Sequence, residues 1–411
     1  MPLTICKTFR ILIFMINRAA EKTLRRYSKG FPVICIAGPR QSGKTTLARK
    51  AFPEKPYVSL EDPDIAHFVR TDPKGFFAAY PKGLILDEAQ YVPEIFLWLK
   101  TVVDENPSPG KYIITGSQQF HLLSSISESL AGRAALLTLL PFTVEELKKG
   151  GHEFPDPFSL MLQGLYPPLY DREVSPLDWY SQYLSLYVER GSRSLRNIKD
   201  LGAFQLFVKM CASRTGQHLN LSAMASDCGI THNTAKAWIS VLETSCIIYL
   251  LKPYHRNYGK RLVKSPKLHF LDPGLACRLL NIRTRQQLFL HPLRGNLFES
   301  FIVSEILKHR LNAGLPPGLY TWRDNTGNEI DALIEDASLT AIEIKSGQTI
   351  IPGITGGLKK WLGFAEKTSS IGEPEVKRKN CCLIYSGGAS LSQEGIRITS
   401  WDRTAAIALP R

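Results

Sequence analysis

The sequence lacks a long hydrophobic run, and this absence argues against a membrane protein. The apolar stretch at residues 11–16 is about a third of the roughly 20 residues that a membrane-spanning helix needs. No small-residue cleavage site follows it, as a secretory signal would require. We therefore expect no membrane partner. Because Met15 is a second possible start of the protein, we assign no role to residues 1–14.

Cysteines are few and scattered along the chain. Of the eight, the only close pair is Cys381 and Cys382, which are adjacent within an apolar run. Cysteines that bind a metal are spaced differently, so this pair does not predict a metal site. The pattern fits a reducing compartment best, and we expect a cytoplasmic protein.

Acidic residues are outnumbered by basic ones, 37 against 51, which gives a formal net charge of +14. Such a balance favours a polyanionic partner, although solubility alone is a simpler explanation. A composition of 44% hydrophobic and 21% charged residues argues against large-scale disorder. The length predicts three domains, at residues 15–150, 151–285 and 286–411.

The first of these is predicted to be an α/β domain. A basic amphipathic helix is expected over residues 18–29, followed by the β-branched apolar run 31–37. Further short apolar runs at residues 57–60, 84–86 and 112–115 are separated by segments of helical length. This alternation is typical of a parallel sheet.

A phosphate-binding loop follows the first predicted strand. Residues 38–45 match the P-loop pattern G-x-x-x-x-G-K-[ST] at every fixed position, directly before a helix-forming segment. Its glycines permit the torsions that turn backbone N–H groups toward phosphate oxygens, and the helix adds its positive N-terminus. Lys44 would reach the β and γ phosphates, and Thr45 would bind Mg²⁺. The expected nucleotide-binding residues are Gly38, Pro39, Arg40, Gln41, Ser42, Gly43, Lys44, Thr45 and Thr46.

Two acidic residues end the apolar run 84–86. Asp87 would bind Mg²⁺ through its water shell, and Glu88 would orient the attacking water as a general base. Taken alone, such a pair is often a strand end with solvated charges. Its position after a P-loop favours the catalytic interpretation.

Two polar residues farther along are candidates for sensing the γ-phosphate. Ser117 ends the next apolar strand, although a Gly-Ser pair there would also suit an ordinary turn. Arg133 lies amid apolar residues, and an unpaired buried guanidinium is costly, so it needs an anion. That anion is either an internal carboxylate or the γ-phosphate of its own or a neighbouring subunit. The neighbouring-subunit alternative implies a homo-oligomer.

Together these motifs resemble the AAA+-type ATPases of bacteria and archaea. More narrowly, the chain resembles the group in which the ATPase domain precedes a winged-helix segment and a domain of unknown function with a restriction-endonuclease-like fold. The resemblance covers nearly everything after Met15. It implies ATP and Mg²⁺ as cofactors.

The middle region carries a helix–turn–helix pattern at residues 221–242. Thr231 would cap the second helix, whose inward face would hold Ala235, Trp238, Ile239 and Leu242. Its outward face would present His232, Asn233 and Lys236 to a DNA major groove. The stretch 252–267 has six basic residues, two tyrosines and no acid, and is expected to form a basic wing. Contact with another domain or subunit is the alternative to nucleic-acid contact.

The C-terminal region resembles the D…ExK signature of the restriction-endonuclease-like superfamily. Strand periodicity puts Glu329 and Asp331 on one face of a strand, and it likewise puts Glu343 and Lys345 on one face of the next. If the two strands pair through a turn at residues 336–338, these faces can converge. The expected metal ligands here are Glu299, Asp331 and Glu343, and Lys345 would position or activate a water. Charges that protect an edge strand from aggregation are the alternative.

Three hypotheses follow from these motifs. The first is an ATP-hydrolysing machine that engages DNA and cuts it. The second is an ATPase whose nuclease-like domain is inert and only binds. The third is a nucleotide switch or scaffold whose basic regions contact an acidic protein, although Glu88 argues against a purely passive switch.

Overall fold

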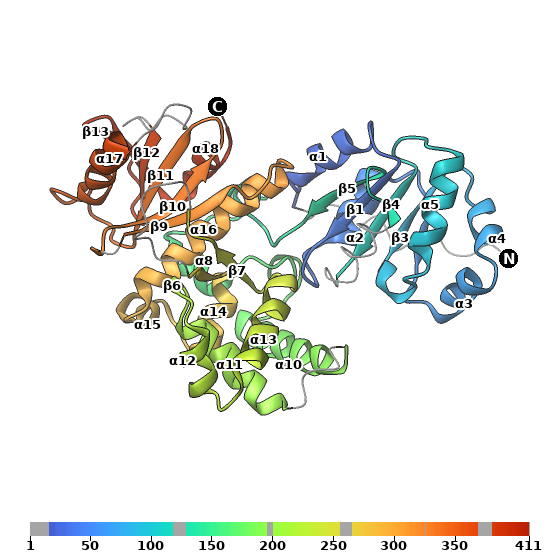
Figure 1. Cartoon of the computed structure of the whole chain (residues 1–411), viewed down its shortest axis with the longest axis horizontal. Helices are drawn as coiled ribbons and strands as arrows, with labels where there is room; N and C mark the ends of the chain where they lie inside the picture. The colour runs from blue at the N-terminus through green and yellow to red at the C-terminus, as the bar shows by residue number, and fades with distance from the viewer. Residues whose placement is uncertain are drawn as a thin grey trace.

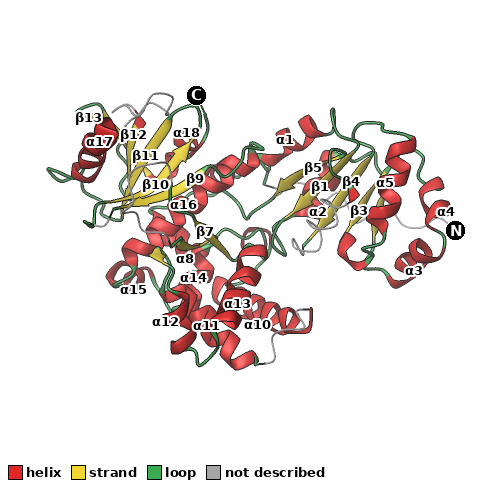
Figure 2. Ribbon diagram, in the orientation of Figure 1, coloured by secondary structure: helices red, strands yellow, loops and turns green. Residues whose placement is uncertain are grey.

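The computed structural model describes residues 16–117, 129–194, 200–254, 265–324, 326–368 and 380–410. Figure 1 shows a sheet with its helices at the right, a second sheet at the upper left and a helical part below. Figure 2 shows that helices predominate in the lower part. No helix within these described ranges is both long enough and apolar enough to cross a bilayer.

The N-terminal part is built on a five-stranded sheet in the order β2-β3-β4-β1-β5, and every neighbouring pair is parallel. Alternate residues of β1 enter two different cores. Cys35 packs in one core and Ile36 in the other. Burial on both faces explains why its strands read as continuous apolar runs. The strands are β1 (Val33–Ala37), β2 (Tyr57–Ser59), β3 (Leu84–Asp87), β4 (Tyr112–Gly116) and β5 (Ala134–Thr138).

Helices cover both faces of this sheet. α1 and α2 pack on one face through Leu24, Leu47 and Ala51. α3, α4 and α5 supply Val69, Phe76 and other apolar side chains to the opposite face. The helices are α1 (Ala20–Tyr27), α2 (Lys44–Ala51), α3 (Pro63–Thr71), α4 (Pro73–Ala78), the short 3₁₀ helix η2 (Ala89–Tyr91) and α5 (Ile95–Glu105).

The middle part is mainly helical and includes the predicted helix–turn–helix pair. Gly229, with φ of +65°, makes the turn, and the Thr231 hydroxyl accepts a hydrogen bond from the N–H of Thr234 at 3.1 Å. The four inward positions expected for α13 are buried. β7 pairs antiparallel with β8, which also pairs with β6. The elements are α7 (Val144–Lys149), α8 (Pro157–Gln163), α9 (Pro168–Asp171), α10 (Pro176–Ser194), α11 (Leu201–Ser213), β6 (Gln217–His218), α12 (Leu221–Asp227), α13 (His232–Thr244), β7 (Ile248–Leu251), β8 (Lys267–Phe270), α14 (Pro273–Leu279) and α15 (Arg285–Leu290).

The C-terminal part contains a six-stranded mixed sheet in the order β13-β14-β12-β11-β10-β9. β10 and β11 pair antiparallel across the turn that the sequence predicts at residues 336–338. β12 runs parallel to β11 on one side and to β14 on the other. The elements are α16 (Arg294–Asn312), β9 (Leu319–Arg323), β10 (Glu329–Glu335), β11 (Leu339–Lys345), α17 (Gly356–Thr368), β12 (Cys381–Tyr385), β13 (Leu391–Gln393), β14 (Ile396–Ser400), the 3₁₀ helix η4 (Trp401–Arg403) and α18 (Ala405–Ala408).

Helix α16 connects the three parts. It packs against β8 of the middle part, β11 of the C-terminal sheet, and α1 and β5 of the N-terminal part. Every residue from Leu297 to Arg310 is buried. A helix buried on all faces must satisfy its polar groups internally. Accordingly, Ser304 donates to the carbonyl of Leu271 at 2.8 Å, and Arg310 pairs with Asp336 at 2.8 Å.

Candidate functional site

The P-loop lies between the end of β1 and the start of α2. Gly38 has φ of +152°, and a Cβ at this position would stand 2.1 Å from the carbonyl oxygen of Leu139. Gly43 has φ of +88° and immediately precedes α2. Both positions therefore require glycine, the first for space and both for their torsions. The helix that follows directs its N-terminus toward the loop.

Lys44 is buried, and its ammonium group is held inside the loop. Its Nζ donates to the carbonyl oxygens of Gly38 at 3.2 Å and Pro39 at 2.8 Å. Burial lowers the pKa of Lys44 to about 8, opposed by the nearby Glu88 and Asp87 carboxylates. Phosphate oxygens would replace these carbonyl acceptors. Their negative charge would favour the charged form of Lys44 and raise its pKa again.

Asp87, at the end of β3, accepts hydrogen bonds from three hydroxyl groups. Thr45 donates to its Oδ1 at 2.8 Å, and Thr115 donates to the same oxygen. Tyr57 donates to Oδ2 at 2.7 Å. The structure thus brings the two predicted Mg²⁺ residues, Thr45 and Asp87, into direct contact. Hydroxyl and carboxylate oxygens suit Mg²⁺, which binds few protein ligands and keeps several waters.

Glu88 has a backbone conformation that is rare for its residue type. Its φ of +54° lies in the left-handed region, and such strain is concentrated at functional sites. Its Oε2 accepts hydrogen bonds from the Ser117 hydroxyl at 3.0 Å and from the Gln90 amide. Gln90 also donates to Ser117 at 3.3 Å. Ser117 therefore lies beside Glu88, where it holds the carboxylate.

The remaining predicted loop residues differ in exposure. Gln41 is exposed, Arg40 is half-buried and Ser42 is fully buried. The Ser42 Oγ has no hydrogen-bond partner among the described residues. Thr46 faces an adjacent cavity that Phe142 and other residues also line.

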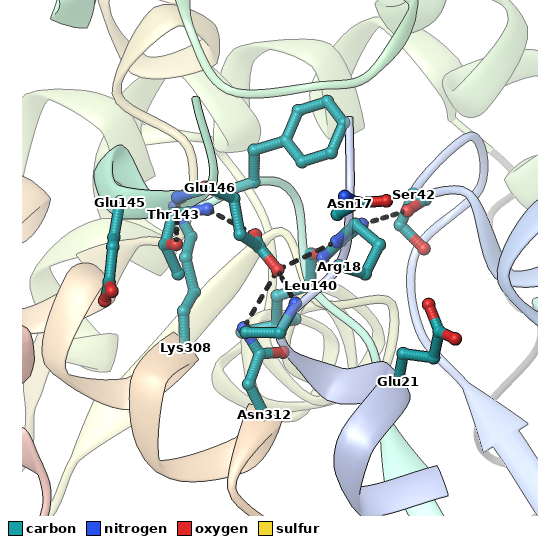
Figure 3. Close-up of polar contacts among 12 residues, drawn as sticks. Asn17, Arg18, Glu21, Ser42, Leu140, Thr143, Glu145, Glu146, Lys308 and Asn312 are labelled. Carbon is teal, nitrogen blue, oxygen red and sulfur yellow. Dashed lines mark hydrogen bonds and ion pairs between the residues drawn. The ribbon is translucent and has the colours of Figure 1, made fainter. Parts of the chain in front are cut away.

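Arg18 connects the P-loop to helix α7, as Figure 3 shows. Its guanidinium donates to the carbonyl oxygens of Ser42 at 2.7 Å and Leu140 at 2.6 Å, and to Glu146 at 3.2 Å. Glu146 also accepts a hydrogen bond from Asn312, at the end of α16, at 3.5 Å. The loop is therefore joined to α16 through buried polar groups.

A second buried contact ties α16 to the same segment. Lys308 donates to the carbonyl of Phe142 and to Glu305, each at 3.1 Å. Glu305 in turn accepts from the N–H of Val144 at 2.8 Å. These contacts fix the segment between β5 and α7 against the helix.

The expectation that Arg133 is buried is wrong. Its side chain is 34% exposed and pairs with Asp104 at the end of α5, where Nη2 lies 3.0 Å from Oδ2. Arg133 precedes β5 beside Val33, whereas the P-loop follows the other end of β1. Five paired residues separate these ends, about 16 Å of strand, so Arg133 lies at the opposite end of the strand from its own P-loop. The internal carboxylate is the anion that the structure provides.

The predicted C-terminal residues line one cavity of about 720 Å³. Glu299 comes from α16, Asp331 from β10, and Glu343 and Lys345 from β11. Lys345 Nζ lies 2.7 Å from Glu343 Oε1, and the N–H of Ile344 donates to Asp331 at 2.7 Å. Burial raises the pKa of Glu299 to about 8, with the nearby Asp331 carboxylate adding to the rise. The structure thus gathers all four residues.

Lys267 belongs to this cavity and not to the predicted basic wing. Residues 255–264 of that wing lie outside the described ranges, and Lys252 is exposed. Lys267, however, is only 3% exposed. Its Nζ lies 2.7 Å from Glu299, 3.9 Å from Asp331 and within bonding distance of Glu329. Its partners are far away in the sequence, so its local basic context was misleading.

This arrangement does not fit a divalent ion at the C-terminal cavity. Within the described ranges, no group of three or more His, Cys, Asp or Glu side chains is arranged to hold a metal ion. The Lys267 ammonium group lies among the carboxylates instead. The expectation that Glu299, Asp331 and Glu343 bind a metal remains a prediction.

Comparison with known proteins divides the chain into three matched regions. Residues 30–148 match a family described as an AAA domain. Residues 156–286 and 294–402 match two families, each described as a domain of unknown function, DUF8612 and DUF4143. "Uncharacterized protein Rv2008c" of Mycobacterium tuberculosis and "Uncharacterized protein Mb2031c" of Mycobacterium bovis are each 30% identical over 363 residues, covering 86% of this chain and 79% of theirs. The chain belongs to the same family as these two proteins.

The N-terminal part of this family member is an AAA-type ATPase domain, as its P-loop predicts. Among solved structures, the Walker-type ATPase PABY2304 of Pyrococcus abyssi matches with 17% identity and a TM-score of 0.46, covering 67% of this chain and 98% of its own.

Sequence reasoning missed four residues of the AAA-type site. Tyr57 and Thr115 bind Asp87, Gln90 binds Glu88, and Arg18 binds the loop. Thr115 and Gln90 occur inside the motifs already recognised, so the strand-end pattern could have indicated them. Tyr57 and Arg18 carry no such signal, because their partners are distant in the sequence.

Proposed function

We propose that this AAA-type domain binds ATP with Mg²⁺ and hydrolyses it. The observation that carries the proposal is the contact between Thr45 and Asp87, which joins the P-loop to the end of β3 at 2.8 Å. Those two side chains would hold Mg²⁺, which neutralises phosphate charge during transfer. Lys44 would bind the phosphates in place of its present carbonyl partners.

Glu88 would act as the general base. Its carboxylate would orient the attacking water and accept its proton, while Ser117 and Gln90 keep it from rotating away. The backbone of Glu88 is in the left-handed region, which is strained for this residue type. A residue used only for binding would gain nothing from this strained position.

The purine base would lie in the cavity next to the P-loop. Gly43 and Thr46 line it on one side, and Ile16, Phe142 and Pro167 supply apolar walls. Apolar and aromatic surfaces suit a flat base, and a few polar groups at the edge set its orientation. Asp171 is one such group in this cavity.

We propose that the middle region is a winged helix that binds nucleic acid, with DNA favoured. His232, Asn233 and Lys236 are exposed on α13, which follows a glycine turn as in helix–turn–helix proteins. The net charge of +14 supports a polyanionic partner. Phosphate contacts would add salt-dependent affinity.

We propose a restriction-endonuclease-like fold for the C-terminal region, and cleavage of DNA as a second candidate activity. What supports it is the shared cavity of Asp331, Glu343 and Lys345. The pairing of Lys267 with Glu299 favours the alternative, in which the region binds without cutting. The pairing of Arg133 with Asp104 supports an internal role for Arg133, and a homo-oligomer in which Arg133 completes a neighbouring site is the alternative.

Two assays test this proposal. ATP hydrolysis is measured with and without DNA, at increasing salt, and DNA is expected to change the rate at low salt only. Cleavage is measured on single- and double-stranded DNA and RNA with Mg²⁺ or Mn²⁺. If nucleic acid does not change the rate of ATP hydrolysis, the proposal of an ATPase stands and the proposed coupling to nucleic acid is overturned.

A further inference from the structure

Three acidic side chains of the C-terminal cavity surround a single lysine. We call Glu299, Glu329 and Asp331 the carboxylate cage. The Lys267 Nζ is 2.7 Å from Glu299 and 3.9 Å from Asp331, and it also pairs with Glu329. The lysine comes from β8 in the middle part, whereas the cage comes from α16 and β10.

Burial makes this pairing necessary for the cage. The Lys267 side chain is 4% exposed, and those of Glu299 and Asp331 are 12% and 17% exposed. Carboxylates so close together and so shielded repel each other unless a cation or a proton lies among them. Arg323, at 3.5 Å from Glu329, is 42% exposed and reaches only the outer edge. Lys267 is therefore the cation that pairs with all three carboxylates of the cage, and Lys345 adds a weaker attraction to Asp331 and Glu299.

Beside the cage, one oxygen has no partner. Glu343 is 8% exposed and lines the same cavity, yet its Oε2 has no hydrogen-bond partner among the described residues. Its Oε1 is taken by Lys345. An unpaired buried carboxylate oxygen on a residue that lines the same cavity as further carboxylates is a ready ligand for a hard cation.

We propose that Lys267 is a built-in cation of this cavity, and that a divalent ion binds among the cage carboxylates and Glu343 only when the lysine ammonium group is removed or withdrawn. The cavity is then a latent divalent-cation site that a residue of the middle part keeps closed. This inference is independent of ATP hydrolysis, and under it the C-terminal cavity could support metal-dependent cleavage only after the ammonium group is withdrawn. It also accounts for an ammonium group lying among residues that resemble a metal site.

The variant Lys267→Met tests the proposal, because it keeps the length of the side chain and removes its charge. Without metal, the variant is expected to melt several degrees below the wild type, since three closely spaced and largely shielded carboxylates lose the cation that pairs with all of them. Without nucleotide, millimolar Mn²⁺ should raise its melting temperature by about 3 °C or more and that of the wild type by less than about 1 °C. Electron paramagnetic resonance of free Mn²⁺ should show one more bound ion per chain in the variant.

Lys308→Met is the matched control. Lys308 is also a fully buried lysine paired with a carboxylate, but its partner Glu305 is a single acid whose other oxygen accepts a backbone hydrogen bond. One carboxylate does not supply enough oxygen ligands, so Mn²⁺ should not restore this variant. Equal Mn²⁺ effects on both variants would overturn the proposal.

A double variant covers the case in which Lys267→Met does not fold. Adding Glu299→Gln removes one charge from the cage, so the double variant should be more stable without metal than Lys267→Met and should respond less to Mn²⁺. The proposal is overturned if the double variant also fails to fold. It is equally overturned if the wild type binds Mn²⁺ at a site that Asp331→Asn removes.

Discussion

The Thr45 hydroxyl donates to the Asp87 carboxylate at 2.8 Å, although 42 positions separate the two residues. The contact joins the start of α2 to the end of β3. β4 lies between β1 and β3 in the sheet, so the start of α2, which follows β1, meets the end of β3 across a neighbouring strand. This relationship turns two separate sequence motifs into one site.

The first prediction concerns Asp87. Asp87→Asn keeps the shape of the side chain but removes the charge that would hold Mg²⁺, so hydrolysis should fall at least about 100-fold. Binding of ATP without Mg²⁺ should be nearly unchanged, as measured by calorimetry. Tyr57→Phe, which removes only the hydrogen bond to Oδ2, is the control and should lose less than about tenfold. Equal losses in both variants would contradict a role in binding Mg²⁺.

The second prediction concerns the support of Glu88. Ser117→Ala removes the hydroxyl that donates to Glu88 at 3.0 Å and should lower kcat by about tenfold, the worth of one hydrogen bond to a charged group. KM should hardly change, because the hydroxyl is proposed to act on the base and not on the nucleotide. Steady-state kinetics check this, and a raised KM with an unchanged kcat would show that Ser117 binds nucleotide instead.

The third prediction concerns Arg18 in the polar network of Figure 3. Arg18→Met leaves the buried Glu146 without its cation and the Ser42 carbonyl without its donor. Breaking a buried pair in this way costs about 3–5 kcal/mol of unfolding free energy, measurable as a lower urea midpoint. Adding Glu146→Gln should recover part of the loss, and no recovery would show that the two residues are not coupled.

The fourth prediction concerns Arg133. If Arg133 acts only on Asp104, then Arg133→Ala and Asp104→Ala should both retain most ATP hydrolysis, because the pair lies away from the P-loop of its own chain. If it completes a neighbouring site, Arg133→Ala alone should be inactive and should regain activity when mixed with Glu88→Gln chains. Rescue in the mixture would overturn the internal role that the pairing with Asp104 supports.

The fifth prediction concerns the exposed face of α13. Lys236→Ala should weaken DNA binding about equally for all sequences and reduce the salt slope by about one. The matched control is Lys74→Ala, an exposed lysine on α4 of the N-terminal part. Fluorescence anisotropy at several salt concentrations measures both. Equal salt slopes for Lys236→Ala and the wild type would remove α13 from the interface.

Local sequence predicted the elements whose signals are themselves local. The run at residues 31–37 and the glycines of the P-loop specify β1, the loop and α2, because strand, turn and helix each depend on near neighbours. The turn at residues 336–338 and the buried face of α13 were predicted for the same reason. β5 was missed, although its apolar residues 134–138 follow directly after the motif at Arg133.

The errors involve charges whose partners are distant. Arg133 has apolar neighbours in sequence, but it precedes its strand at the edge of the sheet and reaches Asp104, 29 positions away. Lys267 ends a basic stretch, yet its carboxylate partners Glu299 and Glu329 are 32 and 62 positions away. Such pairings depend on how helices and strands pack. No local sequence pattern indicates such pairings.

The rate of ATP hydrolysis by Glu88→Gln is the most direct test of Glu88 as the general base of an ATPase. ATP binding is measured on the same sample, and Glu94→Gln, an exposed acid nearby, serves as the control. Glu88→Gln should bind Mg²⁺–ATP within about threefold of the wild type but hydrolyse it at least about 100-fold more slowly, since only the base is lost. Turnover by Glu88→Gln at the wild-type rate would contradict this role of Glu88.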